Sequence, residues 1–388
     1  MTDNRVEVRI GRRRFGGWKS VRIETGIEQL SRAFALEVTE KFPGSTDFGF
    51  FRNGDLVQVY IGDDLVCTGW ISSTPIQYDG KSVKVQIQGK SRTVDLVECC
   101  PPSAAYAVAG SKNAWVGVKG KSGTAITTTS TNPATSWKNQ SVSQIIADLA
   151  KPYGVTVKDE VGIGKTLTNH TVNPGEKVFE SINRLITKEN LVVMDDEQGN
   201  LVITEPGSAG QAADALELGV NILAGSSAFD FSKRYSHYIA VGQHAGIDTD
   251  FGRSAAEDKG TATDSDVGRF RLLVLKDSGQ SGGQMCAARA NFEAAYRRGV
   301  SLKASYTIQG WRQSDGTLWR PNQFIRVEDE ILKRSDLMLV TKIIFQLSAS
   351  GMITTLEVSL PSAFKRDVSS QSNVVTKNAW NPNSRGCT

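Results

Sequence analysis

The triplets closest to a nucleotide-binding motif are four copies of Gly-Lys-Ser/Thr. They begin at Gly80, Gly89, Gly120 and Gly164. A phosphate-binding loop needs another glycine five positions earlier, so that its backbone can wrap around the phosphates. Those positions hold Pro75, Lys84, Trp115 and Asp159. The triplets are therefore better interpreted as turns, and no nucleotide cofactor is expected.

The histidines do not predict a metal site or a histidine-based triad. Only three are present, at positions 170, 237 and 244. His237 and His244 differ in parity along one predicted strand, so a regular strand would point them to opposite faces. No metal cofactor is expected.

The five cysteines favour reduced thiols over zinc binding or nucleophilic catalysis. Cys99 and Cys100 are adjacent, but no second pair or histidine follows at zinc-finger spacing. A nucleophilic thiol would need a neighbouring base, which the sequence does not show. A buried structural thiol is the favoured interpretation.

Carboxylates give no clear catalytic pattern either. Asp195, Asp196 and Glu197 fall in a predicted hairpin turn, where solvated carboxylates are expected. The acidic residues between 248 and 266 miss the calcium-loop pattern, because Gly252 comes one place too early and no glutamate closes the loop. Paired carboxylates of a glycoside hydrolase remain open, since they come from distant positions in a chain. We predict no catalytic residue, and we expect no enzyme.

A few residues are candidates for an interface. Arg12, Arg13 and Arg14 form a short basic run, which a solvated hairpin end also explains. Trp18 follows this run and Trp380 lies in a polar tail, and neither has an obvious core to enter. Exposed aromatic residues of this kind can anchor a partner.

Composition describes an ordinary globular chain. The 388 residues suffice for two to four domains, with 39% hydrophobic and 22% charged residues. No run approaches the length of an apolar membrane span, and no signal-peptide core precedes the first strand. The net charge of +4 does not indicate a nucleic-acid binder. We expect synthesis in the cytoplasm, with export only inside an assembly.

The periodicity predicts an α+β, mainly β fold. Hydrophobic residues alternate with polar ones in the first hundred residues, as at Val57, Val59 and Ile61, which predicts strands. Closure would remove exposed strand edges, so we expect a small antiparallel β-barrel. The predicted divisions are a first β-barrel at 1–98, a Ser/Thr-rich insertion or loop at 99–140, an α/β helix-strand module at 141–226, a second β-barrel at 227–364 and an extended tail at 365–388.

Two predicted helices lie in the α/β module. Ser141 can cap the first, whose apolar face is Val142, Ile145, Ile146 and Leu149. The second has Phe179, Ile182, Leu185 and Ile186 on one face. Residues 191–194 and 201–204 are expected to pair as strands after it. Within 227–364 we predict an exposed acidic loop at 246–268 and a helix at 284–298, with Met285, Ala288, Phe292 and Ala295 facing inward.

The chain contains an internal repeat. Residues 52–59 align with 320–327, residues 65–71 with 337–343, and Val83, Val85 and Ile87 with Leu356, Val358 and Leu360. Two similar β-units in one polypeptide favour a ring-forming structural protein over an enzyme with a single pocket.

The chain also resembles a known family, the baseplate hub proteins of contractile-tailed bacteriophages, of the type in bacteriophage Mu. The segments that carry the resemblance are 69–71, 89–99, 175–180, 196–202, 234–238, 242–243, 310–312, 318–319 and 361–364. They occur in order from about residue 5 to residue 364. The region 101–135 departs by being longer and richer in Ser and Thr.

The resemblance implies a homotrimeric ring related to the T-even hub and to the N-terminal part of type VI secretion spike proteins. Such hubs lie between a hexameric tail tube and a trimeric central spike, among other baseplate proteins, and genomic DNA passes through their channel. The implied location is the virion tail baseplate. Alternatives are the equivalent hub of a tailocin or of a type VI-like injection machine, or a tail-associated cell-wall hydrolase.

Overall fold

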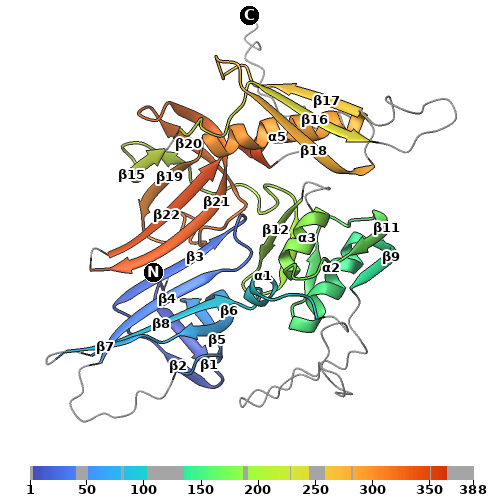
Figure 1. The fold of residues 1–388 in the computed structure, drawn as a ribbon. Coiled ribbons are helices and arrows are strands. Elements are labelled where there is room, and N and C mark those ends of the chain that lie inside the picture. The colour runs from blue at the N-terminus through green and yellow to red at the C-terminus, as the bar shows by residue number, and fades with distance from the viewer. Residues whose placement is uncertain are drawn as a thin grey trace, which may run out of the picture. The chain divides into compact units, whose positions relative to one another are not determined.

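The computed structural model describes residues 3–40, 51–79, 83–102, 135–186, 191–227, 229–243, 258–280, 283–349 and 351–364. These residues form two compact units (Figure 1). The first unit contains the chain up to Phe229 together with Leu302–Phe364, and the second contains Asp230–Ser301. Strands dominate the first unit and contain more residues than helices over the described chain, so the predicted mainly β class is confirmed. No helix among the described residues is long and apolar enough for a membrane span.

The first β arrangement comes from the N-terminal segment. Its strands are β1 (Val6–Ile10), β2 (Arg13–Phe15), β3 (Ser20–Gly26), β4 (Ala33–Glu40), β5 (Leu56–Ile61), β6 (Asp64–Ser73), β7 (Ile76–Tyr78) and β8 (Val83–Ser91). All pairings are antiparallel, in the order β3-β4-β8-β6-β5-β1-β2, with β7 on β8. Val57, Val59 and Ile61 are fully buried, as their alternation predicts.

The second β arrangement uses six strands from the later part of the chain. They are β14 (Leu216–Glu217), β15 (Ile222–Ser227), β19 (Ala304–Gln309), β20 (Phe324–Asp329), β21 (Arg334–Ser348) and β22 (Gly351–Ser359). A short 3-10 turn, η3 (Pro361–Ala363), follows. The order is β15-β19-β22-β21-β20-β14. Only the β14–β20 pair is parallel.

The two arrangements repeat one strand order. The order β3-β4-β8-β6-β5 matches β15-β19-β22-β21-β20 position by position, with antiparallel pairing throughout. The sixth strands differ in direction, because β1 pairs antiparallel with β5 and β14 pairs parallel with β20. A bulge also recurs, after Ile71 in β6 and after Val340 in β21, where each strand pairs with its equivalent neighbour. The internal repeat is therefore present in the strand pairing as well as in the sequence.

The register of the repeat differs from the sequence alignment. Strands β5 and β20 begin at Leu56 and Phe324, as aligned. Leu56 pairs with Trp70 whereas Phe324 pairs with Leu339, so the equivalent of Trp70 is Leu339. The aligned partner, Lys342, was wrong by three positions. The alignment placed four extra residues between these segments of the later copy, whereas the strand pairing shows a net gain of one. The hairpin connection is two residues longer, at 330–333 instead of 62–63, and the bulge in β6, which β21 lacks, offsets one of them.

The later aligned segment is wrong by four positions. Gly89 pairs with Ile71, and Val358 pairs with Val340, directly before the shared bulge. Counting back from these two residues makes Ile87 equivalent to Leu356, rather than to Leu360.

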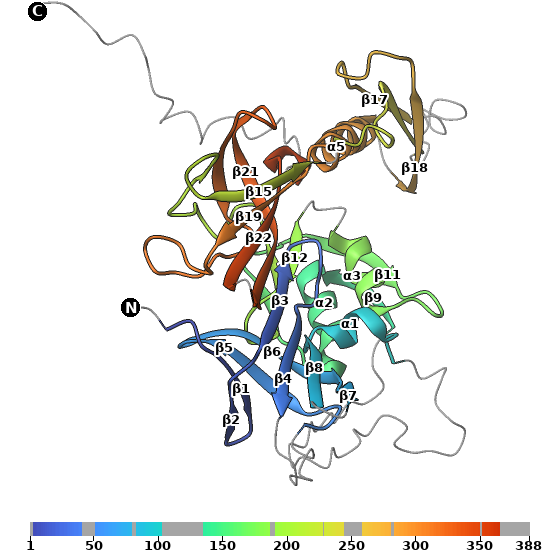
Figure 2. The ribbon, with the colours of Figure 1, turned by 90° about the vertical axis from the view of Figure 1, so that its left-hand side faces the viewer.

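The two arrangements join into one sheet of fourteen strands instead of two closed barrels. Strand β21 pairs with β20 through Phe324–Asp329. It also pairs with β3 through residues 342–347 (Figure 2). Because the far half of β21 is occupied by β3, it does not close its own arrangement. The prediction of closed barrels is therefore wrong for the residues that the structure describes.

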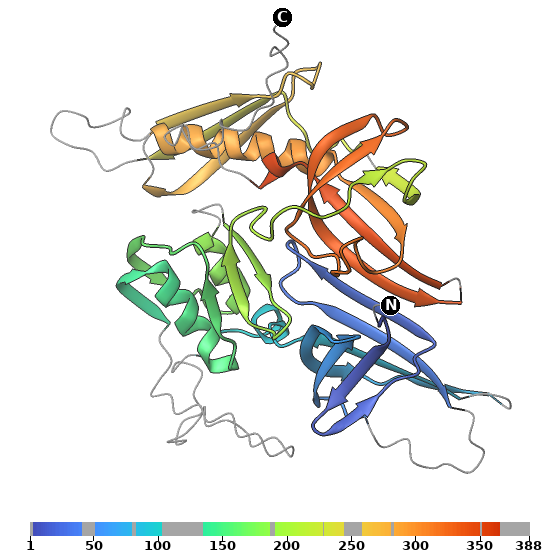
Figure 3. The same ribbon diagram turned by 180° about the vertical axis from the view of Figure 1, so that it is seen from behind.

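The α/β module packs its helices over two small sheets (Figure 3). Its elements are α1 (Val94–Glu98), β9 (Ser136–Ser141), α2 (Val142–Ala150), η2 (Lys151–Tyr153), β10 (Val157–Asp159), β11 (Thr166–Thr171), α3 (Val178–Ile186), β12 (Val192–Asp195) and β13 (Leu201–Thr204). Ser141 caps α2, since its hydroxyl accepts a hydrogen bond from the backbone N–H of Gln144 at 3.2 Å. The predicted antiparallel pairing of β12 with β13 is also present.

The segment between the two β arrangements departs from the predicted divisions. Strands β14 and β15 pair with β20 and β19, although both fall within the predicted 141–226 module. Asp230–Ser301 forms its own unit, with a sheet in the order β17-β16-β18. Its elements are β16 (His237–Gln243), β17 (Asp258–Thr263), β18 (Leu272–Gln280) and α5 (Gly283–Ser301).

The inward face predicted for α5 is also wrong. Its buried residues include Cys286, Ala290 and Glu293, whereas Phe292 is only half-buried. Ala288 and Ala295 are half-buried as well, and Met285 has no described side chain. The apolar pattern predicted the wrong face because Glu293, a charged residue, is buried. Its Oε1 lies 2.7 Å from Nε of Arg297.

The predicted acidic loop is partly a strand. Residues 258–263 form β17, and Asp264 is only 7% exposed. Both carboxylate oxygens of Asp264 accept hydrogen bonds from the buried Arg234, at 2.8 and 2.7 Å. Residues 246–257 lie outside the described residues, as do most of the predicted insertion (103–134) and the predicted tail (365–388).

Candidate functional site

The junction between the two β arrangements is a continuous antiparallel pairing of β3 with β21. Ile23 lies opposite Phe345, and Val21 opposite Leu347. Val21, Ile23 and Phe345 are at most 2% exposed, so their apolar faces form one core across the junction. A Cβ on Gly26 would lie only 2.7 Å from the carbonyl oxygen of Thr341 on β21. The junction therefore depends on a close backbone approach as well as on side-chain packing.

Ion pairs reinforce the polar face of this junction. The ammonium of Lys342 on β21 lies 2.9 Å from Oε2 of Glu24 on β3. Burial alone would raise the pKa of Glu24, but hydrogen bonds from Lys342 and Arg22 hold it below its usual value. Glu24 is consequently a carboxylate that links the two arrangements.

Arg312 forms a second link between the arrangements, away from the β3–β21 pairing. Its Nε donates to Oδ1 of Asn4 at 2.8 Å, and its Nη1 donates to Oδ2 of Asp64 at 2.6 Å. Its Nη2 donates to the carbonyl of Ile61 at 3.1 Å. Arg312 follows β19, whereas Asp64 and Ile61 belong to the β5–β6 hairpin. One guanidinium thus ties a loop of the later arrangement to a hairpin of the earlier one.

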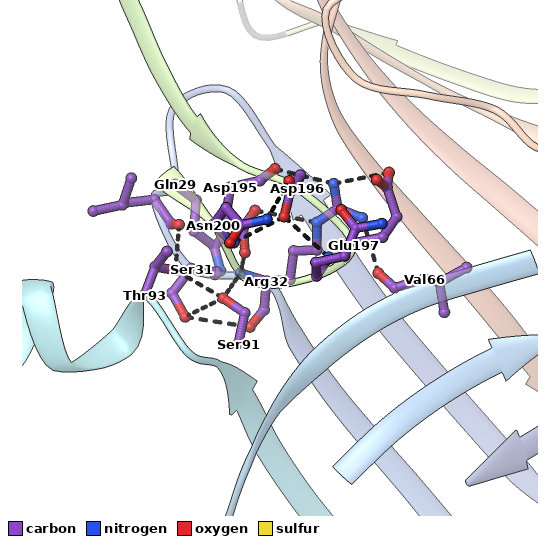
Figure 4. Close-up of polar contacts among 12 residues, drawn as sticks. Gln29, Ser31, Arg32, Val66, Ser91, Thr93, Asp195, Asp196, Glu197 and Asn200 are labelled. Carbon is purple, nitrogen blue, oxygen red and sulfur yellow. Dashed lines mark hydrogen bonds and ion pairs between the residues drawn. The ribbon is translucent and has the colours of Figure 1, made fainter. Parts of the chain in front are cut away.

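A buried polar cluster holds the α/β module to the first β arrangement (Figure 4). Arg32, directly before β4, donates from Nε to Oδ1 of Asp195 at 3.1 Å and from its backbone N–H to Oδ2 at 2.9 Å. Its other nitrogens reach the carbonyls of Val66 and Asp195 at 2.8 and 3.0 Å, and Oε1 of Glu197 at 3.2 Å. Arg32 is 4% exposed and Asp195 is fully buried. Every charge in this cluster has a partner, as burial requires.

Hydroxyl groups complete the cluster. Ser91 at the end of β8 accepts a hydrogen bond from the backbone N–H of Arg32 at 3.1 Å. Its hydroxyl lies 2.8 Å from Oγ1 of Thr93, which donates to the carbonyl of Leu30 at 2.8 Å. Burial opposes the charge on Arg32, but the nearby Asp195 and Glu197 carboxylates raise the pKa of its guanidinium overall. Arg32 is therefore a permanent cation inside the protein.

No pattern in the sequence predicted this cluster. Asp195 was predicted as a solvated turn carboxylate, yet it is the last residue of β12 and fully buried. Asp196 is also enclosed, because it accepts hydrogen bonds from the backbone N–H groups of Gln198 and Asn200 and from the ammonium of Lys158. The only signal was the acidic residue ending a wholly apolar run, and no local pattern identifies a partner 163 positions away.

The predicted interface residues that the structure describes differ in exposure. Arg12 lies in the β1–β2 turn, and Arg13 and Arg14 lie in β2, all three exposed. Nε of Arg14 lies 3.8 Å from Oε1 of Glu7. Trp18 belongs to the hydrophobic core and is only 8% exposed, so the expectation that it has no core is wrong. The physical reason is its packing near Phe51, with ring centroids 6.3 Å apart. Trp380 lies outside the described residues.

The described residues contain no group of three or more His, Cys, Asp or Glu side chains arranged to hold a metal ion. His170 lies 2.9 Å from the hydroxyl of Ser181, and His237 lies 2.9 Å from that of Ser236. Burial raises the pKa of the Cys67 thiol to about 12, which keeps it protonated. The two imidazoles thus lie beside hydroxyl groups, and the Cys67 thiol lies in the hydrophobic core.

Three family models match separate parts of the chain. Residues 5–91 match the N-terminal domain of Mu phage baseplate assembly protein GpP-like proteins. Residues 124–205 match the second domain of gp44-like baseplate hub proteins. Residues 282–367 match the fourth domain of Mu phage baseplate assembly protein GpP.

Individual relatives match over most of the chain. The baseplate hub protein gp44 of Escherichia phage Mu is 30% identical over 362 residues, which cover 91% of this chain and 86% of that protein. The crystal structure of the 43 kDa tail protein of prophage MuSo2 from Shewanella oneidensis has a TM-score of 0.78 and 26% identity, covering 93% and 99% of the two chains. A tail protein from Neisseria meningitidis MC58 shares the fold, with a TM-score of 0.74 and 18% identity over 93% and 97%. The chain belongs to the family of Mu-type phage baseplate hub proteins, as its resemblance to that family predicted.

Proposed function

We propose that this baseplate hub protein acts without enzymatic activity, as a homotrimeric ring that joins a hexameric tail tube to a trimeric central spike. The observation that supports this proposal most directly is the repeated strand order within one chain. Three chains with two similar arrangements each offer six similar surfaces, and six surfaces suit a sixfold tube. The threefold repeat of the whole chain suits a threefold spike.

Differences between the two arrangements support a ring that is threefold overall and only approximately sixfold. Where β5 ends with Ile61, a fully buried residue, β20 ends with Asp329. The carboxylate of Asp329 accepts hydrogen bonds from the backbone N–H groups of Ile331 and Leu332, at 2.9 and 3.0 Å. The later arrangement therefore has a different hairpin, with Ile331 75% exposed at its tip. Such differences make the six surfaces similar rather than identical, as a ring between threefold and sixfold partners needs.

The partners of the proposed ring are the tail tube protein, the central spike protein and other baseplate proteins, and its location is the tail of the virion. Genomic DNA would pass through its channel. The small net charge of +4 is compatible with transit, because many phosphate contacts would retard the DNA.

Light scattering after size exclusion, with electron microscopy of the same fraction, tests the proposal. We expect three copies per particle and threefold rings, and loss of infectious particles when the gene is deleted from its phage. A protein that stays monomeric at high concentration and is absent from purified tails would overturn the proposal. A cell-wall digestion assay tests the non-enzymatic part, since digestion of peptidoglycan by the purified protein would contradict it.

The same ring could serve a tailocin instead of a phage. Neighbouring genes decide between these two settings, because only a phage also encodes a capsid and DNA packaging. The structural role proposed for the chain is the same in either case.

A further inference from the structure

The repeat contains one filled junction and one pair of open edges that correspond to it. In the filled junction, β3 pairs with the far half of β21. The equivalent of β3 is β15, and the equivalent of β21 is β6 continued by β7. Strands β6 and β7 span residues 64–78, and β21 spans residues 334–348, which is the same length. Among the described residues, no strand pairs with the outer edge of β7 or of β15.

Each residue of β7 can be matched to the residue of β21 that holds the same position in the repeat. Because Gly89 is equivalent to Val358, Val85 is equivalent to Thr354. Val85 pairs with Ile76, and Thr354 pairs with Phe345. Ile76 in the first arrangement therefore takes the place of Phe345 in the second.

The same comparison fixes the register on the β15 side. Phe34 pairs with Gly89, and Ala304 pairs with Val358, so these two residues are equivalent. Phe34 also pairs with Ile23, and Ala304 pairs with Ser227. Ser227 therefore takes the place of Ile23, which is the residue that lies opposite Phe345.

Both open edges lack the charged side chains that commonly discourage pairing at a sheet edge, although β7 has only three residues and β15 contains a bulge. Neither β7 (Ile76, Gln77, Tyr78) nor β15 (Ile222–Ser227) contains a charged residue. Ile76 is 48% exposed, Tyr78 is 83% exposed and Leu223 at the β15 bulge is 59% exposed. Free edges in soluble proteins usually contain lysine or outward-facing proline, which discourage pairing. These edges are therefore suited to a partner strand.

We infer that β15 of one copy of this chain pairs antiparallel with β7 of a second copy. Transfer of the filled register places Ile76 opposite Ser227, Gln77 opposite Ser226, and Tyr78 opposite Gly225 of the second copy. This inference rests on the proposed ring and names the strands that join its subunits. Because the two edges are different surfaces, the contact is head-to-tail, and three copies close it into a ring.

Hydrogen-bond parity agrees with this pairing. The carbonyl of Pro75 accepts a hydrogen bond from the N–H of Gln86 on β8, so this carbonyl points towards β8 and away from the open edge. Alternation then directs the backbone groups of Ile76 and Tyr78 to the open edge. The proline, which has no N–H to donate, thus removes nothing from the outer edge.

Parity also identifies the best position for a cross-link. Gln77 and Ser226 would form a non-hydrogen-bonded pair in this register, as Gln346 and Arg22 do in the filled junction. There the N–H of Ile27 donates to the carbonyl of Thr341, and the Arg22–Gln346 pair lies five positions along the strands, so it has the opposite parity. Such pairs have Cα atoms about 4.5 Å apart, which a disulfide can span. Both side chains are exposed in the single chain, so cysteine at either position should not disturb folding.

Disulfide cross-linking tests the inference. The variant Gln77→Cys/Ser226→Cys would be made with Cys100→Ser and Cys387→Ser, then oxidised and analysed on a non-reducing gel. We expect loss of the monomer band and accumulation of covalent trimers with nothing larger. A mixture of the two single variants should stop at covalent dimers, since each chain then supplies one cysteine.

The matched control is Gln77→Cys/Ala224→Cys, because Ala224 is an exposed β15 residue two places out of register. Its Cα would lie about 7–8 Å from that of Gln77, beyond the reach of a disulfide. Equal cross-linking of this control, or covalent dimers of Gln77→Cys alone, would overturn the register and the head-to-tail contact. Trimers in light scattering without the cross-link would overturn the inference but leave the proposed function standing. Monomers at every concentration would overturn both.

Discussion

Arg32 and Asp195 lie 163 positions apart, yet three hydrogen bonds join them within a site that excludes solvent. The arginine belongs to the first β arrangement and the aspartate to the α/β module. Partners on both sides are satisfied, including the carbonyl of Val66. A buried ion pair of this kind contributes little net stability when complete, but breaking it leaves an unpaired charge in a dry site.

Asp195→Asn should therefore destabilise the protein strongly. The substitution keeps the shape of the side chain but removes the buried carboxylate partner of Arg32, so that only the part-exposed Glu197 remains paired with it. We expect a loss of about 3 kcal/mol in the free energy of unfolding, measured by urea denaturation. Glu197→Gln is the control, because Glu197 is 38% exposed and pairs with the same arginine. Its cost should stay below about 1 kcal/mol. Equal effects of the two substitutions would contradict the importance of the buried pair.

Gly89→Ala should destabilise the first β arrangement. A Cβ on Gly89 would lie 2.2 Å from Cζ of Phe34 and 2.4 Å from the carbonyl oxygen of Trp70. Overpacking against backbone and ring atoms should cost about 1–3 kcal/mol in a denaturant melt. Gly164→Ala is the matched control, since no atom lies within 4 Å of its Cβ and its φ is not positive. A control as costly as Gly89→Ala would show that the loss has another cause.

Gly89 and Gly164 illustrate which structural features the sequence could predict and which it could not. Gly89 and Gly164 begin similar Gly-Lys-Ser/Thr triplets, which were both interpreted as turns. This interpretation is wrong for Gly89, because Gly89, Lys90 and Ser91 are the last residues of strand β8. Sequence could not separate them from each other, because only the strand pairing reveals that Phe34 packs against Gly89. Local features such as the Ser141 cap were predictable, since their causes lie within one turn of helix.

Long-range features were predicted less well. The repeat was visible because β5 and β20 share a hydrophobic pattern, but its register was lost where the hairpin lengths differ. Closed barrels were expected because closure removes edges, whereas the chain covers the edge of β21 with β3. A strand's pattern records which face is buried and not which strand lies beside it, so neither feature could be derived from periodicity.

Stability should fall in acid partly through Asp196. Burial acts to raise the pKa of Asp196, but hydrogen bonds from Lys158 and Asn200 lower it below the usual value. A lowered folded-state pKa means that the stabilisation is complete above the unfolded pKa, about 3.9, and is lost as the pH falls towards the folded value. Wild type should therefore exceed Asp196→Asn in urea midpoint near neutral pH, with the difference shrinking below about pH 4. A difference that does not change with pH would contradict this role.

The thiols should react in an order set by their surroundings. Burial, with a contribution from Asp195, raises the pKa of Cys67 to about 12, and its side chain is fully buried. Cys100 is exposed. Iodoacetamide near pH 8 should label Cys100 readily and Cys67 only after unfolding, because the thiolate is the reactive form. Peptide mass spectrometry with and without urea measures both sites, and early labelling of Cys67 in the folded protein would contradict its burial.

Substitutions of Trp18 and of the neighbouring arginines should have different effects, because Trp18 is a core residue and the arginines are exposed. Trp18→Ala should cost about 3–5 kcal/mol, since the ring is buried in the sheet core. Trp18→Phe should cost less, because the indole Nε1 is buried without a hydrogen-bond partner among the described residues and phenylalanine removes that unsatisfied group.

Replacing Arg12, Arg13 and Arg14 together by alanine should change stability by less than about 0.5 kcal/mol, because all three are exposed. If this hairpin contacts a baseplate partner, the triple variant should fold normally but enter tails poorly, measured by its amount in purified particles. Lys177→Ala/Lys233→Ala/Arg269→Ala is the matched control, since it removes the same charge from other exposed positions. Normal incorporation of the arginine variant would remove the hairpin from the interface, and poor incorporation of both variants would show only a general need for positive charge.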